Sequence, residues 1–315
     1  MSMNPQEIVT LDIGGTAVKS GILRRAVVRR ADTAHDWEPS EAISWLRHVE
    51  RSPIFSGASA DAIVDSLGSI CERQISRCEA PAAIAAAFPG PCDYEQGIPY
   101  IEGLAKFGSL YGRNLKVMLA DRLGRGLPIF LAHDATAAGI GEVRARRIMG
   151  RVLMITLGTG FGSVFLERCG LRRGPFRWSE TGELFAEPAH GLRADDVFSV
   201  RGLDRRLSIC STSCSRLSQA RAVDGIEMKV QKVLGAFGHD LGRWLAPYVR
   251  EAEVELVVVG GGLAAYFPWL EGPMRSALPV PVVASLLGDR AGLFGAACLY
   301  EEARESLRTA ATVDA

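Results

Sequence analysis

Apolar runs that end at glycines are the main pattern of hydrophobic and polar positions along this chain. Apolar and β-branched residues run together over 7–13, 151–157 and 254–259, and each run ends at a glycine or directly before a glycine-containing turn. Short apolar runs bounded by turn residues predict buried strands. The first two runs are followed by a second one, over 17–23 and 161–168, so a strand, a tight turn and a strand are expected twice.

Segments with helical spacing separate these strands. Helices are predicted over 39–51, 59–77, 112–123, 134–146, 193–206, 223–250 and 290–308. Further strands are predicted over 26–32, 82–88, 128–133 and 281–285. The alternation predicts an α/β chain, and the repeated strand, glycine turn and strand predict two similar lobes with a ligand-binding cleft between them.

The boundary between the lobes is expected at residues 132 and 133. We assign 1–132 to an N-terminal lobe and 133–299 to a C-terminal lobe, with the last helix, about 300–315, packing back on the N-terminal lobe. At 315 residues the chain is long for one hydrophobic core, which favours two domains.

Composition and charge exclude several classes of protein. Apolar residues make up 48%, and the formal net charge is zero, so the basic footprint of a nucleic-acid-binding protein is missing. No run approaches the roughly 20 apolar residues of a membrane helix, and the N-terminal segment does not resemble a signal peptide. The seven cysteines are irregularly spaced. We therefore expect a cytoplasmic protein with reduced thiols that binds neither nucleic acid nor membrane.

The first glycine turn carries candidate phosphate-binding chemistry. Gly14 and Gly15 let the backbone approach phosphate oxygens, and successive N–H groups can form an anion-binding nest. Thr16 adds a hydroxyl, Lys19 could reach a phosphate as a point charge, and Asp12 could hold Mg²⁺ through water. An ordinary hairpin with a solvated aspartate would produce the same local pattern.

Two further glycine clusters follow predicted strands. They comprise Gly158, Thr159 and Gly160, and then Gly260, Gly261 and Gly262. One such cluster is a weak signal, and none is a P-loop or a dinucleotide-binding fingerprint. Three of them, each at the end of a buried strand, favour a nucleotide ligand whose adenine and ribose could meet the third cluster.

In this order the motifs resemble the ROK family (repressors, uncharacterised frames and sugar kinases) of the actin-like ATPase superfamily, from Ile8 to about Tyr300. The resemblance also covers Phe88 to Pro91, Asp134 to Ala138, Gly182 to Leu184 and Ala291 to Ala297. It implies a two-lobed actin-like (ribonuclease H-like) α/β fold with the active site in the interlobe cleft. It further implies ATP and Mg²⁺ as cofactors, a small-molecule sugar as substrate, and a homodimer.

The resemblance assigns roles to particular side chains. Asp134 matches the catalytic base of the family, and a carboxylate at a helix start can accept the proton of an attacking hydroxyl. An N-cap is the alternative role for Asp134 and is compatible with catalysis. Glu183 resembles the glutamate that binds sugar hydroxyls, and Gly90, His133 and His190 fall on the same acceptor side.

The acceptor side departs from the family pattern. His133 replaces an asparagine, Gly103 replaces another, and the family's Glu-x-Gly-His reads Glu183-Leu184-Phe185-Ala186, with His190 as a nearby substitute. The cysteine-rich zinc loop is also missing, so no structural zinc is expected. An unusual sugar preference follows, because unmatched hydroxyl partners are costly.

The predicted activity is an ATP-dependent sugar kinase, similar to glucokinases and N-acetyl-amino-sugar kinases. The run 157–163 resembles polyphosphate glucokinases, and the nearby Arg172-Arg173 could help to bind a polyanion, which leaves polyphosphate open as the donor. A sugar-responsive repressor is disfavoured, since few residues precede Ile8. A non-catalytic sugar or nucleotide sensor of the same fold is the remaining alternative, and Asp12 and Asp134 argue against it.

Overall fold

The computed structural model describes residues 6–25, 41–102, 106–174, 176–177, 182–210 and 228–313. Its contacts divide the chain into two compact units: unit 1 comprises 1–147 and 289–315, and unit 2 comprises 148–288. The predicted boundary at 132 and 133 lies before helix α5 (Asp134–Arg146), whereas this division falls after it. The reason is that α5 packs extensively against α11 (Ala291–Val313) within unit 1.

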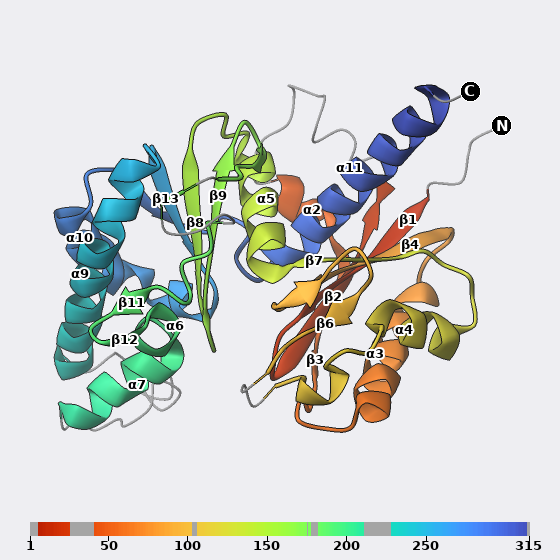
Figure 1. Ribbon diagram of the computed structural model, residues 1–315, viewed down its shortest axis with the longest axis horizontal. Helices are drawn as coiled ribbons and strands as arrows, with labels where there is room; N and C mark the ends of the chain where they lie inside the picture. Colours follow the sequence, from red (N-terminus) through yellow and green to blue (C-terminus); the bar gives the residue numbers. More distant parts are fainter. Residues whose placement is uncertain are drawn as a thin grey trace. The chain divides into compact units, whose positions relative to one another are not determined.

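Unit 1 is built on a five-stranded sheet in the order β3-β2-β1-β4-β7 (Figure 1). Its strands are β1 (Glu7–Ile13), β2 (Ala17–Arg24), β3 (Arg47–Pro53), β4 (Pro81–Phe88) and β7 (Ile129–His133). β1 and β2 form the predicted antiparallel hairpin, whereas β1, β4 and β7 are parallel. Asp12 is in register with Ala87, and Phe88 with His133. The segments that follow the three parallel strands therefore leave the sheet at one edge.

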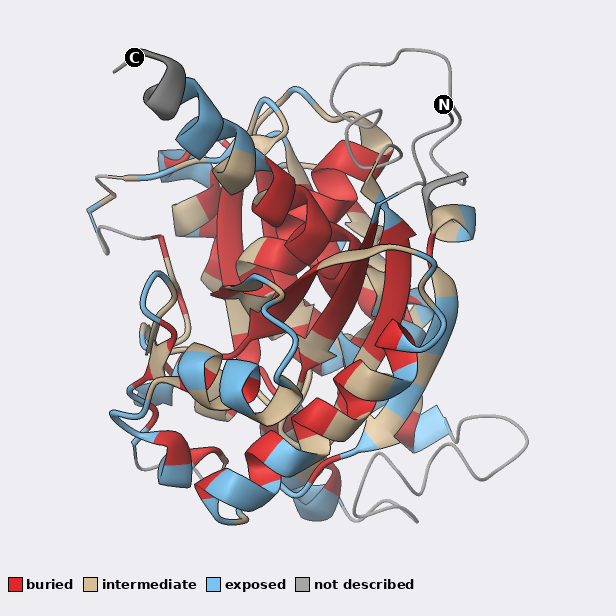
Figure 2. Ribbon diagram, turned by 90° about the vertical axis from the view of Figure 1, so that its right-hand side faces the viewer, coloured by how far each residue is buried: buried red, intermediate tan, exposed pale blue. Residues whose placement is uncertain are grey.

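Helices cover both faces of this sheet. α3 (Ala60–Ile75) and α4 (Leu115–Leu123) pack on the face that carries Val9, Leu11 and Ile13. α11 packs against β1 and β4. Strand β1, most of β4 and the first turns of α11 are buried, while the C-terminal turns of α11 are exposed (Figure 2). Because side chains alternate along a strand, Asp12 lies on the face opposite to Leu11 and Ile13.

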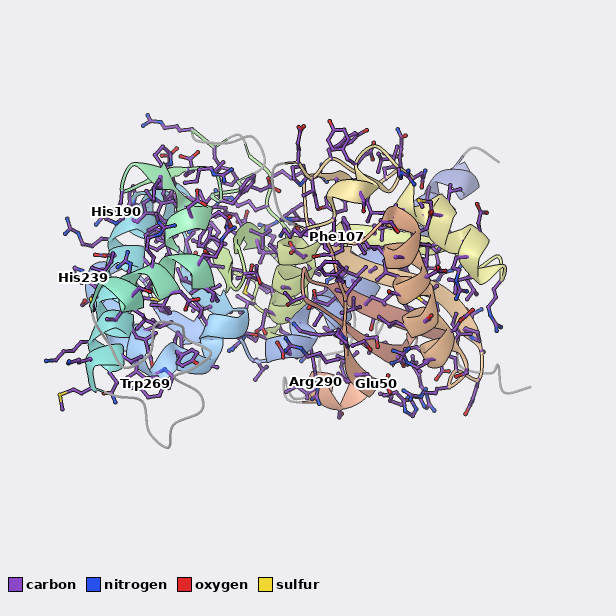
Figure 3. All side chains as sticks on the ribbon, turned by 90° about the horizontal axis from the view of Figure 1, so that it is seen from below. Glu50, Phe107, His190, His239, Trp269 and Arg290 are labelled. Atoms are coloured by element: carbon purple, nitrogen blue, oxygen red, sulfur yellow. The ribbon has the colours of Figure 1, made fainter. Side chains whose placement is uncertain are left out.

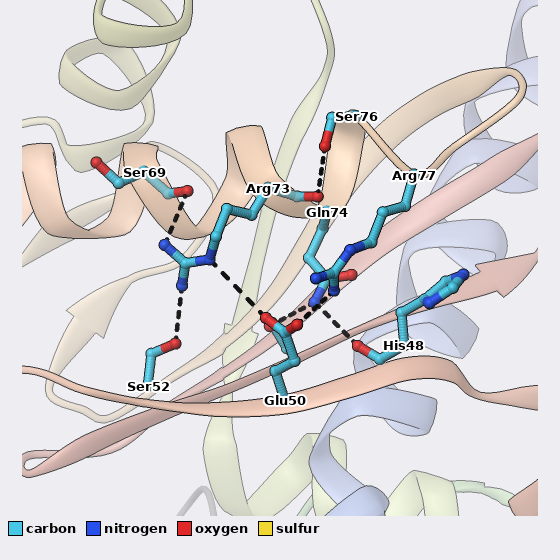
Figure 4. A network of polar contacts seen from close by, with 9 residues as sticks. His48, Glu50, Ser52, Ser69, Arg73, Gln74, Ser76 and Arg77 are labelled. Carbon is cyan, nitrogen blue, oxygen red and sulfur yellow. Dashed lines mark hydrogen bonds and ion pairs between the residues drawn. The ribbon is translucent and has the colours of Figure 1, made fainter.

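Strand β3 corrects one prediction. The helix predicted over 39–51 is wrong, because α2 covers only Glu41–Trp45 and the chain then forms β3 at the sheet edge. Polar contacts join β3 to α3 and to the turn after it. The Gln74 amide of α3 donates to the His48 carbonyl at 3.0 Å, and the Arg77 guanidinium, just beyond α3, donates to the Glu50 carboxylate at 2.5 Å (Figure 4). Tertiary pairing with β2 thus overrides the local helical spacing. The strand predicted over 26–32 lies outside the described residues.

Unit 2 contains a second five-stranded sheet in the order β10-β9-β8-β13-β14. Its strands are β8 (Val152–Leu157), β9 (Phe161–Glu167), β10 (Gly170–Leu171), β13 (Leu256–Gly260) and β14 (Val282–Ala284). The core beneath it comes from α6 (Ala194–Val197), α7 (Val200–Ile209), α9 (Met228–Glu251) and α10 (Phe267–Ala277). The single helix predicted over 193–206 is therefore two helices, interrupted at Phe198 and Ser199.

Short elements complete the described chain. They are β5 (Cys92–Asp93), β6 (Ile98–Pro99), β11 (Pro188–Ala189), β12 (Leu192–Arg193) and the 3₁₀ turns Gly108–Leu110, Gly262–Tyr266 and Gly288–Arg290. Across the described ranges, no helix combines the length and the apolar character needed to cross a membrane.

Glycines allow α5 and α11 to approach backbone to backbone. A Cβ on Gly295 would overlap the Ala137 carbonyl, and one on Gly141 would overlap the Ala291 carbonyl. We expect Gly295→Ala to lower the free energy of unfolding by about 1–3 kcal/mol or more, because the helices must separate. Gly235→Ala on α9 is the control: its nearest new contact is an ordinary 3.7 Å, and helix propensity favours alanine. Urea unfolding measures both, and an unshifted midpoint for Gly295→Ala would contradict this packing.

Candidate active site

The turn between β1 and β2 presents free backbone donors. The Gly14 N–H closes the turn on the Ala17 carbonyl at 3.0 Å, and the Ser56 hydroxyl donates to the Gly15 carbonyl at 2.5 Å. Within the described part of the chain, the N–H groups of Gly15 and Thr16 have no acceptor. Two adjacent free N–H groups at a glycine turn can bind an anion such as a phosphate oxygen.

Asp12 and Lys19 form an ion pair beside this turn. The hairpin register places them opposite each other, and Lys19 Nζ lies 3.0 Å from Asp12 Oδ2. Lys19 also lies 3.1 Å from Asp289 Oδ1, a carboxylate that the sequence analysis did not identify. Asp289 belongs to the turn before α11, so its position depends on the packing of that helix in unit 1.

The charges at this site act on one another. Burial raises the pKa of Asp12; the Lys19 ammonium opposes this effect, and the negative charges of Asp134 and Asp289 add to it. Burial lowers the pKa of Lys19, but the carboxylates of Asp12 and Asp289 outweigh burial and leave that pKa raised. Lys19 therefore stays protonated at neutral pH and provides a fixed positive charge.

Helix α11 forms a wall against the Asp12 carboxylate. A Cβ on Gly292 would lie 2.9 Å from Asp12 Cγ, so only glycine leaves the carboxylate its present place. Among the described residues, no three His, Cys, Asp or Glu side chains lie close enough together to hold a metal by themselves. Mg²⁺ fits Asp12 nevertheless, because that ion commonly binds one or two carboxylates and completes its shell with water and substrate phosphates.

Asp134 is the first residue of α5 and directly follows β7. Its Oδ1 accepts the Ala135 N–H at 2.7 Å, and its side chain is 41% exposed. His133 Nε2 lies 3.3 Å from the same Oδ1. Asp134 thus combines a structural hydrogen bond with an accessible carboxylate at the carboxyl edge of the sheet.

An aromatic side chain joins the predicted acceptor residues of unit 1. A Cβ on Gly90 would lie 3.0 Å from the Tyr94 hydroxyl and 3.6 Å from the His133 ring. The Tyr94 and His133 ring centroids are 5.9 Å apart. The structure therefore brings Gly90 and His133 together next to Asp134. Tyr94 was missed, because its position depends on the turn that follows β4.

The third glycine cluster, Gly260–Gly262, contacts the end of β8 directly before the second cluster. Gly261 has a φ of +81°, and a Cβ on it would lie 2.5 Å from the Leu157 carbonyl oxygen. This close approach joins the segment after β13 to the end of β8, as the pairing of Gly260 with Thr156 requires. The Gly158 N–H donates a hydrogen bond to the Gly160 carbonyl within the same turn, at 2.9 Å.

Asp195 holds the Gly158–Gly160 turn from outside. Its Oδ1 accepts the Phe161 N–H at 2.7 Å, and its Oδ2 is 2.6 Å from the Arg201 guanidinium. A Cβ on Gly160 would lie 2.7 Å from the same Oδ1. Sequence reasoning missed this aspartate, although its place at the first turn of a helix next to a second acidic residue gave a weak signal.

Glu183 and His190 occupy different surroundings in unit 2. Glu183 is partly buried, and the following Leu184 N–H is held by the Ser163 hydroxyl of β9 at 2.8 Å. His190 lies exposed in the turn between β11 and β12, with its ring centroid 6.3 Å from that of Phe198 (Figure 3).

Known proteins resemble this chain over most of its length. The glucokinase of Thermotoga maritima is 26% identical over 337 residues, covering 94% of this chain and 98% of that protein. The crystal structure of a ROK family glucokinase from Streptomyces griseus in complex with glucose and AMPPNP gives a TM-score of 0.70 at 22% identity, covering 93% and 98%. The crystal structure of the inorganic polyphosphate/ATP-glucomannokinase from Arthrobacter sp. strain KM gives a TM-score of 0.68 at 24% identity. The match covers 93% of this chain and 97% of that protein.

The two solved structures confirm the predicted fold, an α/β architecture of the actin-like ATPase type. The sequence model of the ROK family matches residues 46–303, most of the chain. The chain therefore belongs to the ROK family.

Proposed function

We propose that this protein is a carbohydrate kinase that transfers the γ-phosphoryl group of ATP to a hydroxyl of a sugar or sugar derivative. The observation that carries the proposal lies within unit 1. The accessible Asp134 carboxylate and the free N–H groups of Gly15 and Thr16 follow strands that end at one edge of one sheet. Similarity to proteins named glucokinase supports the same reaction.

Asp134 is the proposed catalytic base. An ionised carboxylate can take the proton of the attacking hydroxyl as the new P–O bond forms. The hydrogen bond that Asp134 accepts from the Ala135 N–H fixes the orientation of its carboxylate. The remaining demand in phosphoryl transfer is to position the phosphates and neutralise their charge. We assign that work to the Gly15 and Thr16 N–H groups and to Lys19.

Asp12 is proposed to bind Mg²⁺, either directly or through a water molecule, and water would fill other positions around the ion. When bound, Mg²⁺ would neutralise negative charge on the phosphate oxygens of ATP. Lys19 and the Gly292 backbone hold the Asp12 carboxylate in place for this purpose. The glycine turns of unit 2, Gly158–Gly160 and Gly260–Gly262, are proposed as further nucleotide-binding segments.

The acceptor is proposed to be a sugar. Gly90 and His133 of unit 1 are proposed to contact its hydroxyls, and Glu183 and His190 of unit 2 stay predicted sugar-binding residues. His133 and Tyr94 lie next to Asp134 in unit 1, and an imidazole with a phenol offers different hydrogen bonds from an asparagine amide. A sugar preference different from that of glucokinases follows. We also propose a cytoplasmic location, where ATP is available.

Polyphosphate is a second candidate donor. The specific observation is the likeness to a solved structure named inorganic polyphosphate/ATP-glucomannokinase. Arg172, one of the two arginines considered for this role, already donates to the Ala252 carbonyl and lies over the Phe176 ring at 5.7 Å. These contacts within unit 2 favour a structural role for Arg172, so ATP is the first choice.

Asp134→Asn is expected to lower kcat by about 10²- to 10⁴-fold, because the amide cannot take the hydroxyl proton. Asparagine can still accept the Ala135 N–H, so the helix start and ATP affinity should be kept. An ADP-release assay over hexoses, amino sugars and N-acetyl sugars measures turnover, and calorimetry measures ATP binding. An unchanged rate would refute the base, whereas ATP binding without turnover of any sugar by the unmodified protein would favour the sensor alternative.

Asp195→Ala is expected to weaken binding of a non-hydrolysable ATP analogue by about tenfold, because the Phe161 N–H loses its acceptor and the Gly158–Gly160 turn loosens. The control is the neighbouring Asp196→Ala, whose carboxylate bonds the Arg193 side chain rather than the turn. Calorimetric titration of both variants measures the difference. If Asp195→Ala bound the analogue as tightly as Asp196→Ala and the unmodified protein, the Gly158–Gly160 turn would have no part in nucleotide binding.

A thermal-shift assay tests which phosphoryl donor the protein binds, because a ligand that binds the folded protein raises the protein's apparent stability. ATP with Mg²⁺ is expected to raise the melting temperature more than polyphosphate of matched phosphate concentration. Arg172→Met should leave the ATP shift unaltered. A larger shift with polyphosphate would reverse the choice of donor.

A further inference from the structure

Lys106 lies against the Gly14–Gly15 turn. If Gly15 carried a Cβ, that atom would lie 3.3 Å from Lys106 Cδ and 3.6 Å from Lys106 Cβ. The aliphatic stem thus covers the glycine, and the ammonium group begins only two bonds beyond Cδ. The free N–H groups of Gly15 and Thr16 belong to the same turn.

Neighbouring contacts fix the backbone of Lys106 relative to this turn. The Phe107 N–H donates to the Ser56 carbonyl at 2.7 Å, and the Ser56 hydroxyl donates to the Gly15 carbonyl. Phe107 is fully buried (its position is labelled in Figure 3), and its ring centroid is 5.2 Å from that of Phe88. Lys106 is therefore anchored at the turn by its neighbour rather than carried on a freely moving loop.

The charge of Lys106 is available to a ligand. Lys19 is paired with Asp12 and Asp289, and Lys116 donates to the Glu95 carbonyl at 2.7 Å. In the ranges that the structure describes, no carboxylate pairs with Lys106. The chain has five lysines against 31 arginines, and two of the five lie at this one turn. A lysine ammonium is a compact point charge on a flexible stem, which suits a phosphate that changes its geometry during transfer.

We propose that Lys106 is a second lysine ligand of the nucleotide phosphates, acting with Lys19 at the Gly14–Gly15 turn. This inference rests on the proposed kinase function. Lys19 keeps Asp12 in place, while the Lys106 ammonium contacts the phosphate oxygens and balances their charge during transfer. A lysine stem that only packs on the glycine is the alternative, since long basic side chains often cover apolar surface in this way.

An acyl-phosphate derivative of ATP tests the position of the amine directly. The neutral amine attacks the carbonyl of the mixed anhydride, an amide bond forms, the C–O bond to the terminal phosphate breaks, and ATP leaves. The transferred proton goes to the buffer. Peptide mass spectrometry then reports which of the five lysines carries the acyl group, with and without excess ATP. Lys116, Lys229 and Lys232 serve as internal controls whose labelling should not respond to ATP.

Acylation of Lys106 that excess ATP suppresses is the expected result. ATP-protected acylation of Lys19 without Lys106 would overturn this inference and leave the proposed function intact. Absence of ATP-protected acylation at both lysines would overturn the inference and also count against ATP binding at this turn.

Substitution separates the charge from the packing. Lys106→Met keeps a long apolar stem over Gly15, so the fold should be retained, whereas ATP affinity should fall about tenfold or more. Lys106→Arg should restore part of that affinity, and Lys116→Met should behave as the unmodified protein. Calorimetric titration with ATP and Mg²⁺ measures the ATP affinity of all three variants. Unchanged ATP affinity in Lys106→Met would reduce Lys106 to a packing residue.

Discussion

The parallel pairing of β1, β4 and β7 determines where the proposed catalytic groups of unit 1 lie, because it sends three loops out at the same edge of the sheet. Asp12 is in register with Ala87 and Phe88 with His133, so the glycine turn, the Pro-Gly-Pro segment and the start of α5 become neighbours. A slip of one residue in β1 would turn Asp12 into the apolar layer beneath α3. Hydrophobic burial on that face therefore protects the position of a charged side chain on the other.

The partly buried carboxylate of Asp12 illustrates how the surrounding structure compensates an unfavourable environment. Burial opposes its ionised form, and Lys19 offsets that effect through an ion pair and hydrogen bond. Asp289 engages the other side of Lys19. Because ion pairs hold the Asp12 carboxylate and the Lys19 ammonium in place, little reorganisation is needed when phosphate charge arrives, which is how enzymes obtain large electrostatic effects from ordinary side chains.

Local sequence patterns predicted the strands that end at glycine, the hairpin and the helix that starts at Asp134, since each depends on a short apolar run and a nearby turn residue. Strand β3 was missed because the apolar spacing around Trp45 fits a helix, and only pairing with β2 makes it a strand. The roles of Asp195 and Lys106 could not be predicted for another reason: each side chain contacts a glycine turn that is far away in the sequence. Contacts of that kind follow from how elements pack, and no local periodicity encodes them.

The Gly292 wall against Asp12 joins a strand near the beginning of the chain to a helix near residue 300. During synthesis β1 emerges first and α11 only after all of unit 2 has been made. Until then the face of β1 and β4 that α11 covers stays exposed, and the Asp12 carboxylate lacks its contact with Gly292. The surroundings of Asp12 are therefore complete only after the last helix of the chain has been made and has packed against β1 and β4.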